Sequence, residues 1–261
     1  MDDIVTDRSD GILRIQLNRP EKLNAMTSGM YLGLADIIDS AARDERIRVV
    51  LWHGAGHAFS AGNDIEDFLE NPPGEGESPQ ARLMKALVDF DKPLVAAVHG
   101  AAIGGGTTML LHCDFVYAAE GTRFQMPFID LALVPEFGSS GILPHTIGHL
   151  RTAELILLGS PFDAARAADL GLVTRVVPEA ELLAAATGTA RHLAAKPSAA
   201  LQASKRLLKR SFRDLTTAAM AAENEVFSIQ VRSDEAKAAL AAFIEKHAPA
   251  TAKASEPAAA P

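Results

Sequence analysis

Three consecutive glycines, Gly104 to Gly106, stand between the apolar run LVAAVHGAAI and the helix-like run TTMLLHCD. This order predicts a turn that leads into a helix N-terminus, where backbone N–H groups point outward and attract negative charge. A second turn of small residues, in the upstream stretch HAFSAGNDIEDF, can supply another N–H group. Two converging donors would make an oxyanion hole, whereas a glycine triplet alone more often marks a close contact between a helix and a strand.

A lone carboxylate follows in PEFGSSG, where Glu136 comes directly after a proline and shortly before a glycine. These neighbours predict a tight turn instead of a regular element. Glu136 is therefore a candidate general acid or base, and the alternative is that it is simply solvated, as most glutamates on turns are.

The composition limits the classes of function. A chain of 261 residues with 48% hydrophobic content can build a substantial core in one large or two small domains. The formal net charge of −8 and the aromatic content of 5% argue against nucleic acid or an anionic membrane as the main partner, and no apolar run reaches the roughly 20 residues of a membrane span.

Cysteine and histidine usage gives no sign of a metal centre. Cys113 is the single cysteine, which excludes an intrachain disulfide and a cysteine-rich metal site and fits a reducing compartment. The eight histidines show no H-E-x-x-H spacing, and His112 beside Cys113 is the nearest pair. We expect a cytoplasmic protein without a metal or signal peptide.

Periodicity places these candidates between strands and helices. We expect buried or half-buried strands, and helices wherever apolar residues recur at 3.6-residue spacing. A loop of small residues is expected at 56–68, and it leads into a polar, mobile stretch at 71–80. The expected strands cover 11–20, 47–54, 94–100, 113–121 and 124–128, and the expected helices cover 26–43, with Thr27 or Ser28 as N-cap, 81–90, 107–111 and 152–159. Residues 165–178 predict a helix, a Gly171 C-cap and a short strand, and residues 141–148 a connection.

Beyond Pro178 the pattern is entirely helical, and the last residues lack core-forming side chains. The natural division is an α/β core over residues 1–195, a helical region over 196–247 and a disordered tail over 248–261.

A series of motifs in order resembles the crotonase, or enoyl-CoA hydratase/isomerase, superfamily. They are NRPEKLNAM at 18–26, FSAGNDI at 59–65, KPLVAAVHGAAIGGG at 92–106, CDFVYA at 113–118, LALVPEFGSSGILP at 131–144 and ADLGLVTRVVP at 168–178. The resemblance implies a spiral of ββα turns with C-terminal helices that assemble a homotrimer or a hexamer, and an acyl-CoA thioester as substrate with no separate cofactor.

Carried over by motif, the resemblance implies that the backbone N–H groups of Asn63 and Gly105 hold the thioester oxygen. The two glutamates of the family's hydratases are replaced here by Thr108 and Phe128, neither of which can act as a general base near neutral pH. Glu136 stands where the peroxisomal type of Δ3,Δ2-enoyl-CoA isomerase has its catalytic glutamate, so isomerisation is favoured over hydration.

The resemblance also implies the binding residues. The CoA moiety is expected along Lys22, Leu23, Ala25 and the segment Ser60, Ala61, Gly62, Asp64 and Ile65. The acyl group is expected near Phe128, Ile129 and Leu133, and Gly104 is a further substrate-binding candidate. Phe243 and Lys246 are expected to reach over from a C-terminal helix, of a neighbouring subunit, although Phe243 can equally belong to the core and Lys246 to a solvated helix end. Two alternatives stay open: a ring isomerase acting on 1,2-epoxyphenylacetyl-CoA, and a catalytically silent acyl-CoA-binding protein.

Overall fold

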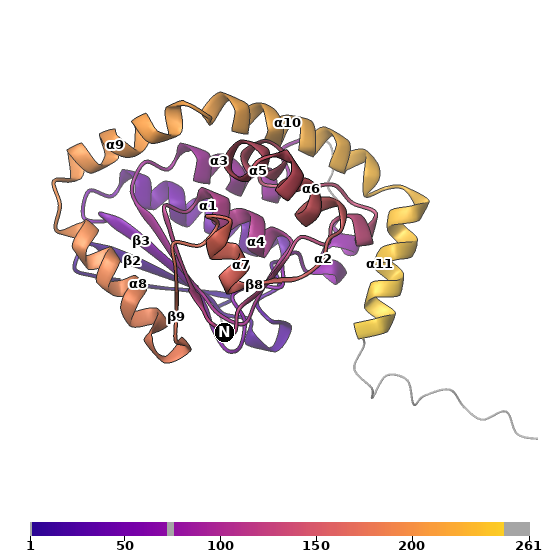
Figure 1. Ribbon diagram of the computed structural model, residues 1–261, viewed down its shortest axis with the longest axis horizontal. Coiled ribbons are helices and arrows are strands. Elements are labelled where there is room, and N and C mark those ends of the chain that lie inside the picture. Colours follow the sequence, from indigo (N-terminus) through magenta and orange to yellow (C-terminus); the bar gives the residue numbers. More distant parts are fainter. Residues whose placement is uncertain (1, 72–75, 248–261) are drawn as a thin grey trace, which may run out of the picture.

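The structure is a computed structural model and describes residues 2–71 and 76–247 (Figure 1). Within these residues, six strands form one sheet in the order β1-β2-β3-β4-β6-β9, and all neighbours are parallel except the hairpin of β1 and β2. The strands are β1 (Ile4–Ser9), β2 (Ile12–Leu17), β3 (Val49–Gly54), β4 (Leu94–Val98), β6 (Phe115–Ala119) and β9 (Arg175–Val177). Parallel neighbours require crossover connections, which the helices between these strands provide.

A second, smaller sheet continues the chain from the first. It contains β5 (Ala101–Ile103), β7 (Arg123–Gln125) and β8 (Phe162–Asp163) in that order. Only His99 and Gly100 separate β4 from β5, and Gly100 adopts φ +60° where an added Cβ would lie 1.8 Å from the carbonyl oxygen of His57. Since β4 pairs with β6 and β5 with β7, successive turns of the chain stack on one another, which is the ββα spiral that the resemblance implied.

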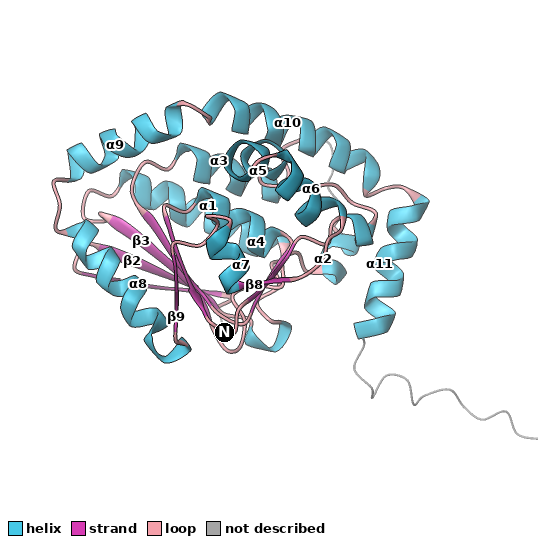
Figure 2. Ribbon diagram, viewed as in Figure 1, coloured by secondary structure: helices cyan, strands magenta, loops and turns pink. Residues whose placement is uncertain are grey.

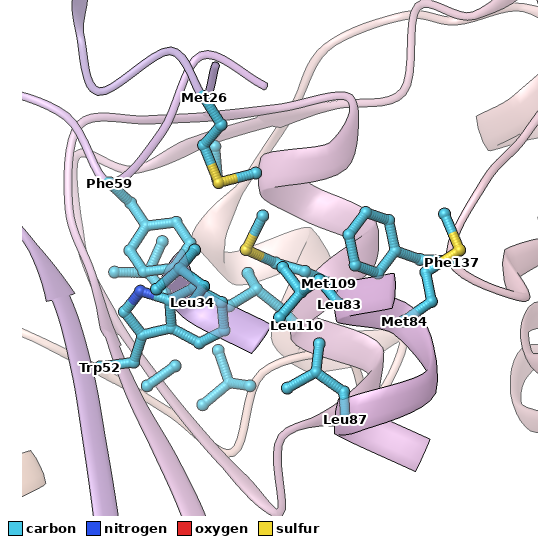
Figure 3. Close-up of a cluster of buried hydrophobic side chains, with 14 of the residues drawn as sticks. Met26, Leu34, Trp52, Phe59, Leu83, Met84, Leu87, Met109, Leu110 and Phe137 are labelled. Carbon is cyan, nitrogen blue, oxygen red and sulfur yellow. The ribbon is translucent and has the colours of Figure 1, made fainter. Parts of the chain in front are cut away.

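Helices cover both faces of the larger sheet (Figure 2). Side chains alternate along β3, so Val49 and Leu51 pack under α8 (Glu179–Ala194), while Val50 and Trp52 face the main core. That core includes side chains of α1 (Ser28–Arg43) and α3 (Pro79–Asp89), and Figure 3 shows Trp52, Phe59 and Phe137 among its members.

The remaining helices complete the fold, and α4 and α7 contact the second sheet. α9 and α10 arch over α3 and α5, and α11 descends beside α2 (Figure 1). The bounds of the remaining helices are α2 (Ile65–Glu70), α4 (Gly105–Thr108), α5 (Ser139–Ile147), α6 (His149–Leu157), α7 (Ala164–Asp169), α9 (Ser198–Arg210), α10 (Arg213–Gln230) and α11 (Asp234–His247). Three 3-10 turns are η1 (Pro20–Lys22), η2 (Met109–His112) and η3 (Ile129–Leu131). No helix within the described ranges combines the length and the apolar character that a membrane crossing needs.

Most predicted elements are confirmed, and a few predictions were wrong. Thr27 caps α1 as expected, because its side chain accepts from Met30 N. The stretch expected as a loop at 56–68 ends in α2, and the expected connection at 141–148 belongs to α5, which contains Pro144. The strand expected at 124–128 ends at Gln125, and β1 and β5 were not predicted. The expected tail and residues 72–75 of the polar stretch lie outside the described residues.

Candidate active site

Two glycine turns from different parts of the chain meet at the edge of the second sheet. An added Cβ on Gly62 would lie 2.6 Å from the carbonyl oxygen of Ile103 and 3.4 Å from Gly105 N, so these backbones are in direct contact. Gly62 adopts φ +85° and Gly104 φ +54°, conformations that L side chains rarely adopt. Glycine is therefore required at both positions by the backbone geometry that brings the turns together.

The N–H groups of Asn63 and Gly105 are available for a ligand. Met26 N donates to Gly62 O at 2.7 Å and Asp64 N donates to Met26 O at 2.9 Å, a pattern that passes over the N–H of Asn63. Gly105 is the first residue of α4, where N–H groups have no acceptor within the helix. Among the described residues neither N–H has a hydrogen-bond partner.

The carboxylate of Glu136 lies beside this pair of turns. Glu136 is only 3% exposed, and a Cβ added to Gly105 would lie 2.7 Å from Glu136 Oε1. The alternative that Glu136 is solvated on its turn is therefore wrong. A buried carboxylate and two backbone donors meet within one small region.

The Asn63 side chain links Glu136 to Tyr31. Asn63 Nδ2 donates to Glu136 Oε1 at 3.4 Å, and Asn63 Oδ1 accepts from the Tyr31 hydroxyl at 2.7 Å. Tyr31 is fully buried on α1 and can present only its hydroxyl to the amide oxygen. With the hydroxyl donating to Oδ1, the amide nitrogen faces Glu136, whose ionised carboxylate can only accept.

The surroundings adjust the acidity of Glu136. Burial raises its pKa from 4.5 to about 7, the hydrogen bond from Asn63 opposes the rise, and the negative charge of Glu223 adds to it. Burial, with a further contribution from the charge of Glu136, raises the pKa of Tyr31 well above its usual value, so Tyr31 stays a neutral donor. Glu136 can therefore exist in both protonation states near neutral pH, as general acid–base catalysis requires.

A half-buried histidine and a buried glutamate hold the turn that carries Glu136. Phe137 and Gly138 adopt φ +60° and +69°, a conformation unusual for phenylalanine. His112 Nε2 donates to Phe137 O at 2.8 Å, and Glu223 on α10 accepts from Gly138 N and Ser140 N, both at 2.7 Å. Burial lowers the pKa of His112 to about 4, so the imidazole is neutral. The turn is thus fixed from both η2 and α10.

The residues expected to bind CoA lie around the first turn. Ala61 N donates to Leu23 O at 2.9 Å and Ser60 Oγ donates to Asn24 O at 2.9 Å, which joins the 22–26 stretch to the 60–65 loop. Lys22 is exposed and paired with Glu66 at 2.9 Å.

Asp64 has a structural role in the same loop. Its carboxylate caps α2 by accepting from Glu66 N and Asp67 N, and it pairs with Arg19 at 2.9 Å. Burial opposes ionisation of Asp64, but the Arg19 hydrogen bond and the α2 N–H groups outweigh it and hold its pKa below the usual value. Asp64 is therefore the N-cap of α2.

The residues expected near the acyl group differ in exposure. Phe128 is buried, and an added Cβ on Gly104 would lie 3.9 Å from its ring. Leu133 is also buried, whereas Ile129 on η3 is 46% exposed. Phe243 and Lys246 are exposed on α11, which packs against α2 and η3 of its own chain.

Sequence reasoning missed Tyr31, His112 as a support of the turn, and Glu223. Each is separated from its partner by a long stretch of chain: Glu223 lies 85 residues from Gly138 and Tyr31 lies 32 residues from Asn63. No local pattern marks such pairs. The one signal available was a glutamate and a tyrosine on the otherwise apolar faces of two predicted helices.

Comparison with known proteins agrees with this geometry. The family model described as enoyl-CoA hydratase/isomerase matches residues 7–253. The chain is 32% identical over 256 residues to the 1,2-epoxyphenylacetyl-CoA isomerase of Escherichia coli K12, covering 95% of this chain and 98% of that protein. It is 33% identical over 250 residues to human enoyl-CoA delta isomerase 2, covering 93% of this chain and 63% of that protein.

Solved structures show the same fold. An enoyl-CoA hydratase/isomerase from Pseudoalteromonas atlantica T6c superposes with a TM-score of 0.90 at 38% identity, covering 95% of this chain and 99% of that one. Relatives of this chain carry both hydratase and isomerase names. The chain belongs to the enoyl-CoA hydratase/isomerase family and is an acyl-CoA-processing enzyme.

Proposed function

We propose that this enzyme shifts the double bond of a 3-enoyl-CoA to the 2-position, with Glu136 as the single acid–base group. The observation that carries the proposal is the buried Glu136 carboxylate beside the N–H groups of Asn63 and Gly105, with a pKa raised to about 7 by burial.

The reaction needs one mobile proton and one site for negative charge. With the thioester oxygen at the N–H groups of Asn63 and Gly105, Glu136 takes a proton from C2, and the electrons of the C2–H bond move to give a dienolate. The protonated Glu136 then returns the proton to C4, and the double bond ends between C2 and C3. Oxyanion donors of this kind typically contribute about 3–4 kcal/mol each.

Hydration is less well supported by the residues present. Thr108, at one hydratase position, is buried and directs its hydroxyl to Gly104 O at 3.3 Å, and Phe128 occupies the other. Neither side chain can activate water, which would leave Glu136 to perform both of the roles that hydratases divide between two carboxylates.

The substrate is proposed to bind as an acyl-CoA without a separate cofactor. Its CoA moiety would follow the joined segments 22–26 and 60–65, with Phe243 and Lys246 contributing from α11, and its acyl group would pass Phe128 and Leu133. A homotrimer or hexamer, as the family resemblance implies, is the assembly we propose.

One alternative is supported by a specific finding. The E. coli relative is a 1,2-epoxyphenylacetyl-CoA isomerase and matches nearly the whole chain, so a ring substrate is the second candidate.

The test is to incubate the purified enzyme with a straight-chain 3-enoyl-CoA and to follow the absorbance of the conjugated thioester. Formation of the conjugated product supports the proposal. Conversion of 1,2-epoxyphenylacetyl-CoA alone would favour the ring isomerase, and binding of both thioesters without turnover would indicate a silent binding protein.

A further inference from the structure

A cavity of about 310 Å³ opens beside Glu136, between the first turns of α3 and the C-terminal half of α10. Glu136 forms part of its wall, so the cavity begins where the reacting carbons of the proposed substrate lie. Its volume is within the range of small-molecule sites. The part of the acyl group beyond C4 therefore has this space available.

The walls of the cavity are more polar than a saturated chain requires. Met84 and Phe227 supply apolar surface, while Gln80 from α3 and Asn224 from α10 contribute side-chain amides. Gln80 is only 8% exposed, so its amide is held in a largely water-excluded position.

Neither amide is used elsewhere in the fold. Among the residues that the structure describes, no hydrogen bond engages the side chain of Gln80 or of Asn224. Both amides line the open cavity, and neither is among the described side-chain atoms that are buried without a partner, so water can satisfy them until a ligand fills the space. A ligand that displaces this water without replacing its hydrogen bonds costs about 1–3 kcal/mol for each group in mutational series. A saturated chain in this cavity would leave both amides unsatisfied.

The charge of the cavity limits what a polar ligand can be. Three carboxylates, Glu77, Glu136 and Glu223, line it, and no lysine or arginine is among the described residues that line it. An anionic acyl end would be repelled and would find no cation to pair with. A neutral oxygen, as a hydroxyl, carbonyl or ether, can bond to the amides without this penalty.

We propose that Gln80 and Asn224 form a specificity site for a neutral, oxygen-bearing acyl group, and that the preferred substrate is not a saturated long-chain fatty acyl thioester. The proposal rests on the proposed function for the position of the acyl group next to Glu136. It applies equally to a straight chain with a hydroxyl group and to an oxygen-containing ring.

Binding measurements test the site without turnover. Dissociation constants of hexanoyl-CoA, 5-hydroxyhexanoyl-CoA, 6-hydroxyhexanoyl-CoA and adipoyl-CoA, which carry no double bond to move, are measured by calorimetry on the full chain. We expect at least one hydroxyacyl thioester to bind roughly fivefold more tightly than hexanoyl-CoA, and adipoyl-CoA to bind more weakly than either hydroxyacyl thioester.

Matched variants assign the preference to the two amides. Gln80→Leu and Asn224→Leu should each reduce the preference for hydroxyacyl thioesters, and Gln230→Leu, on α10 but not at the cavity, should leave it unchanged. Equal or tighter binding of hexanoyl-CoA by the wild type, a preference that survives in both cavity variants, or tightest binding of adipoyl-CoA would overturn the proposal. If the preference holds while no 3-enoyl-CoA is isomerised, only the proposed reaction fails.

Discussion

The hydroxyl of Tyr31 donates to Asn63 Oδ1 at 2.7 Å, and the other end of the same amide faces Glu136 Oε1. A buried side chain on α1 thereby holds the amide of a residue in the 60–65 loop against Glu136. Tyr31 does not itself touch the carboxylate through a hydrogen bond, so we regard it as a positioning residue.

Tyr31→Phe should therefore lower kcat with little change in KM. Without the phenol, the Asn63 amide can rotate and its hydrogen bond to Glu136, which lowers the pKa of Glu136, is weakened. The loss of one hydrogen bond corresponds to roughly a 3- to 10-fold decrease in kcat, and the acidic limb of the kcat/KM profile should move to higher pH. An unchanged pH profile would show that Tyr31 serves packing alone.

Glu136→Gln should retain the fold and acyl-CoA binding but lose at least about 100-fold in turnover, because an amide cannot carry the proton. Asp64→Asn is the comparison, since Asp64 caps α2 and pairs with Arg19. It should reduce thermal stability and affect turnover much less. If Asp64→Asn abolished the reaction while Glu136→Gln stayed active, the base would lie in the 60–65 loop.

The pH dependence of stability should also report on Glu136. Its pKa is about 7 in the folded protein against 4.5 ordinarily, so the folded state binds the proton more tightly than the unfolded state. The stabilisation that comes from this tighter proton binding is fully present below about pH 4.5 and is lost as the pH rises through about 7. Relative to Glu136→Gln, the free energy of unfolding of the wild type should fall by up to about 3 kcal/mol across this interval.

Denaturant titrations at several pH values measure this difference. Activity should rise over the same interval in which stability falls, because both follow ionisation of one carboxylate. Burial raises the pKa of Glu223 as well. Glu223 therefore contributes to the pH dependence of stability with the same sign in the wild type and in Glu136→Gln, and this contribution cancels to first order in the difference between them. Parallel stability curves for wild type and variant would contradict the assignment of the raised pKa to Glu136.

Glu223→Ala should destabilise the protein by about 2–3 kcal/mol, because Gly138 N and Ser140 N lose a charged acceptor in a buried position. Glu225→Ala, two residues away and exposed, should change stability by less than about 0.5 kcal/mol. Glu223→Gln removes the charge but keeps an acceptor, so it should fold and should shift the acidic limb of the kcat/KM profile to lower pH. A shift in the opposite direction would refute the electrostatic role.

Gly105→Ala should remove most of the turnover. The added methyl would lie 2.7 Å from Glu136 Oε1 and 3.2 Å from the Tyr31 hydroxyl, so the carboxylate must move. Gly121→Ala is the matched control, because nothing lies within 4 Å of the Cβ it would add. Kinetic constants and melting temperatures of both variants separate the effect on the site from any effect on folding. Activity of Gly105→Ala within about twofold of the wild type would contradict the close approach of Gly105 to the Glu136 carboxylate.

Local chemistry in the sequence determined most of the elements and the chemical candidates. The apolar run at β4, the Thr27 cap and the glycine triplet before α4 depend on neighbouring residues, so their patterns are visible without a fold. The motif order also selected Asn63, Gly105 and Glu136 as the candidate site residues, which the fold brings close together. The helix over Ser139–Ile147 was not visible, because Pro144 and Gly141 disfavour it locally. It forms where Gly138 and Gly141 allow α10 to approach closely, with an added Cβ on Gly141 only 2.8 Å from Ala219 Cβ.

Only the tertiary structure decided whether Glu136 is solvated or buried. A turn sequence is compatible with both, and the outcome depends on α10, η2 and the two glycine turns at Gly62 and Gly104, which enclose the carboxylate from distant parts of the chain. The same is true of Tyr31 and Glu223, whose partners are separated from them by 32 and 85 residues. Desolvation and long-range hydrogen bonds are properties of the assembled fold, and they convert a common turn glutamate into a group that ionises near neutral pH.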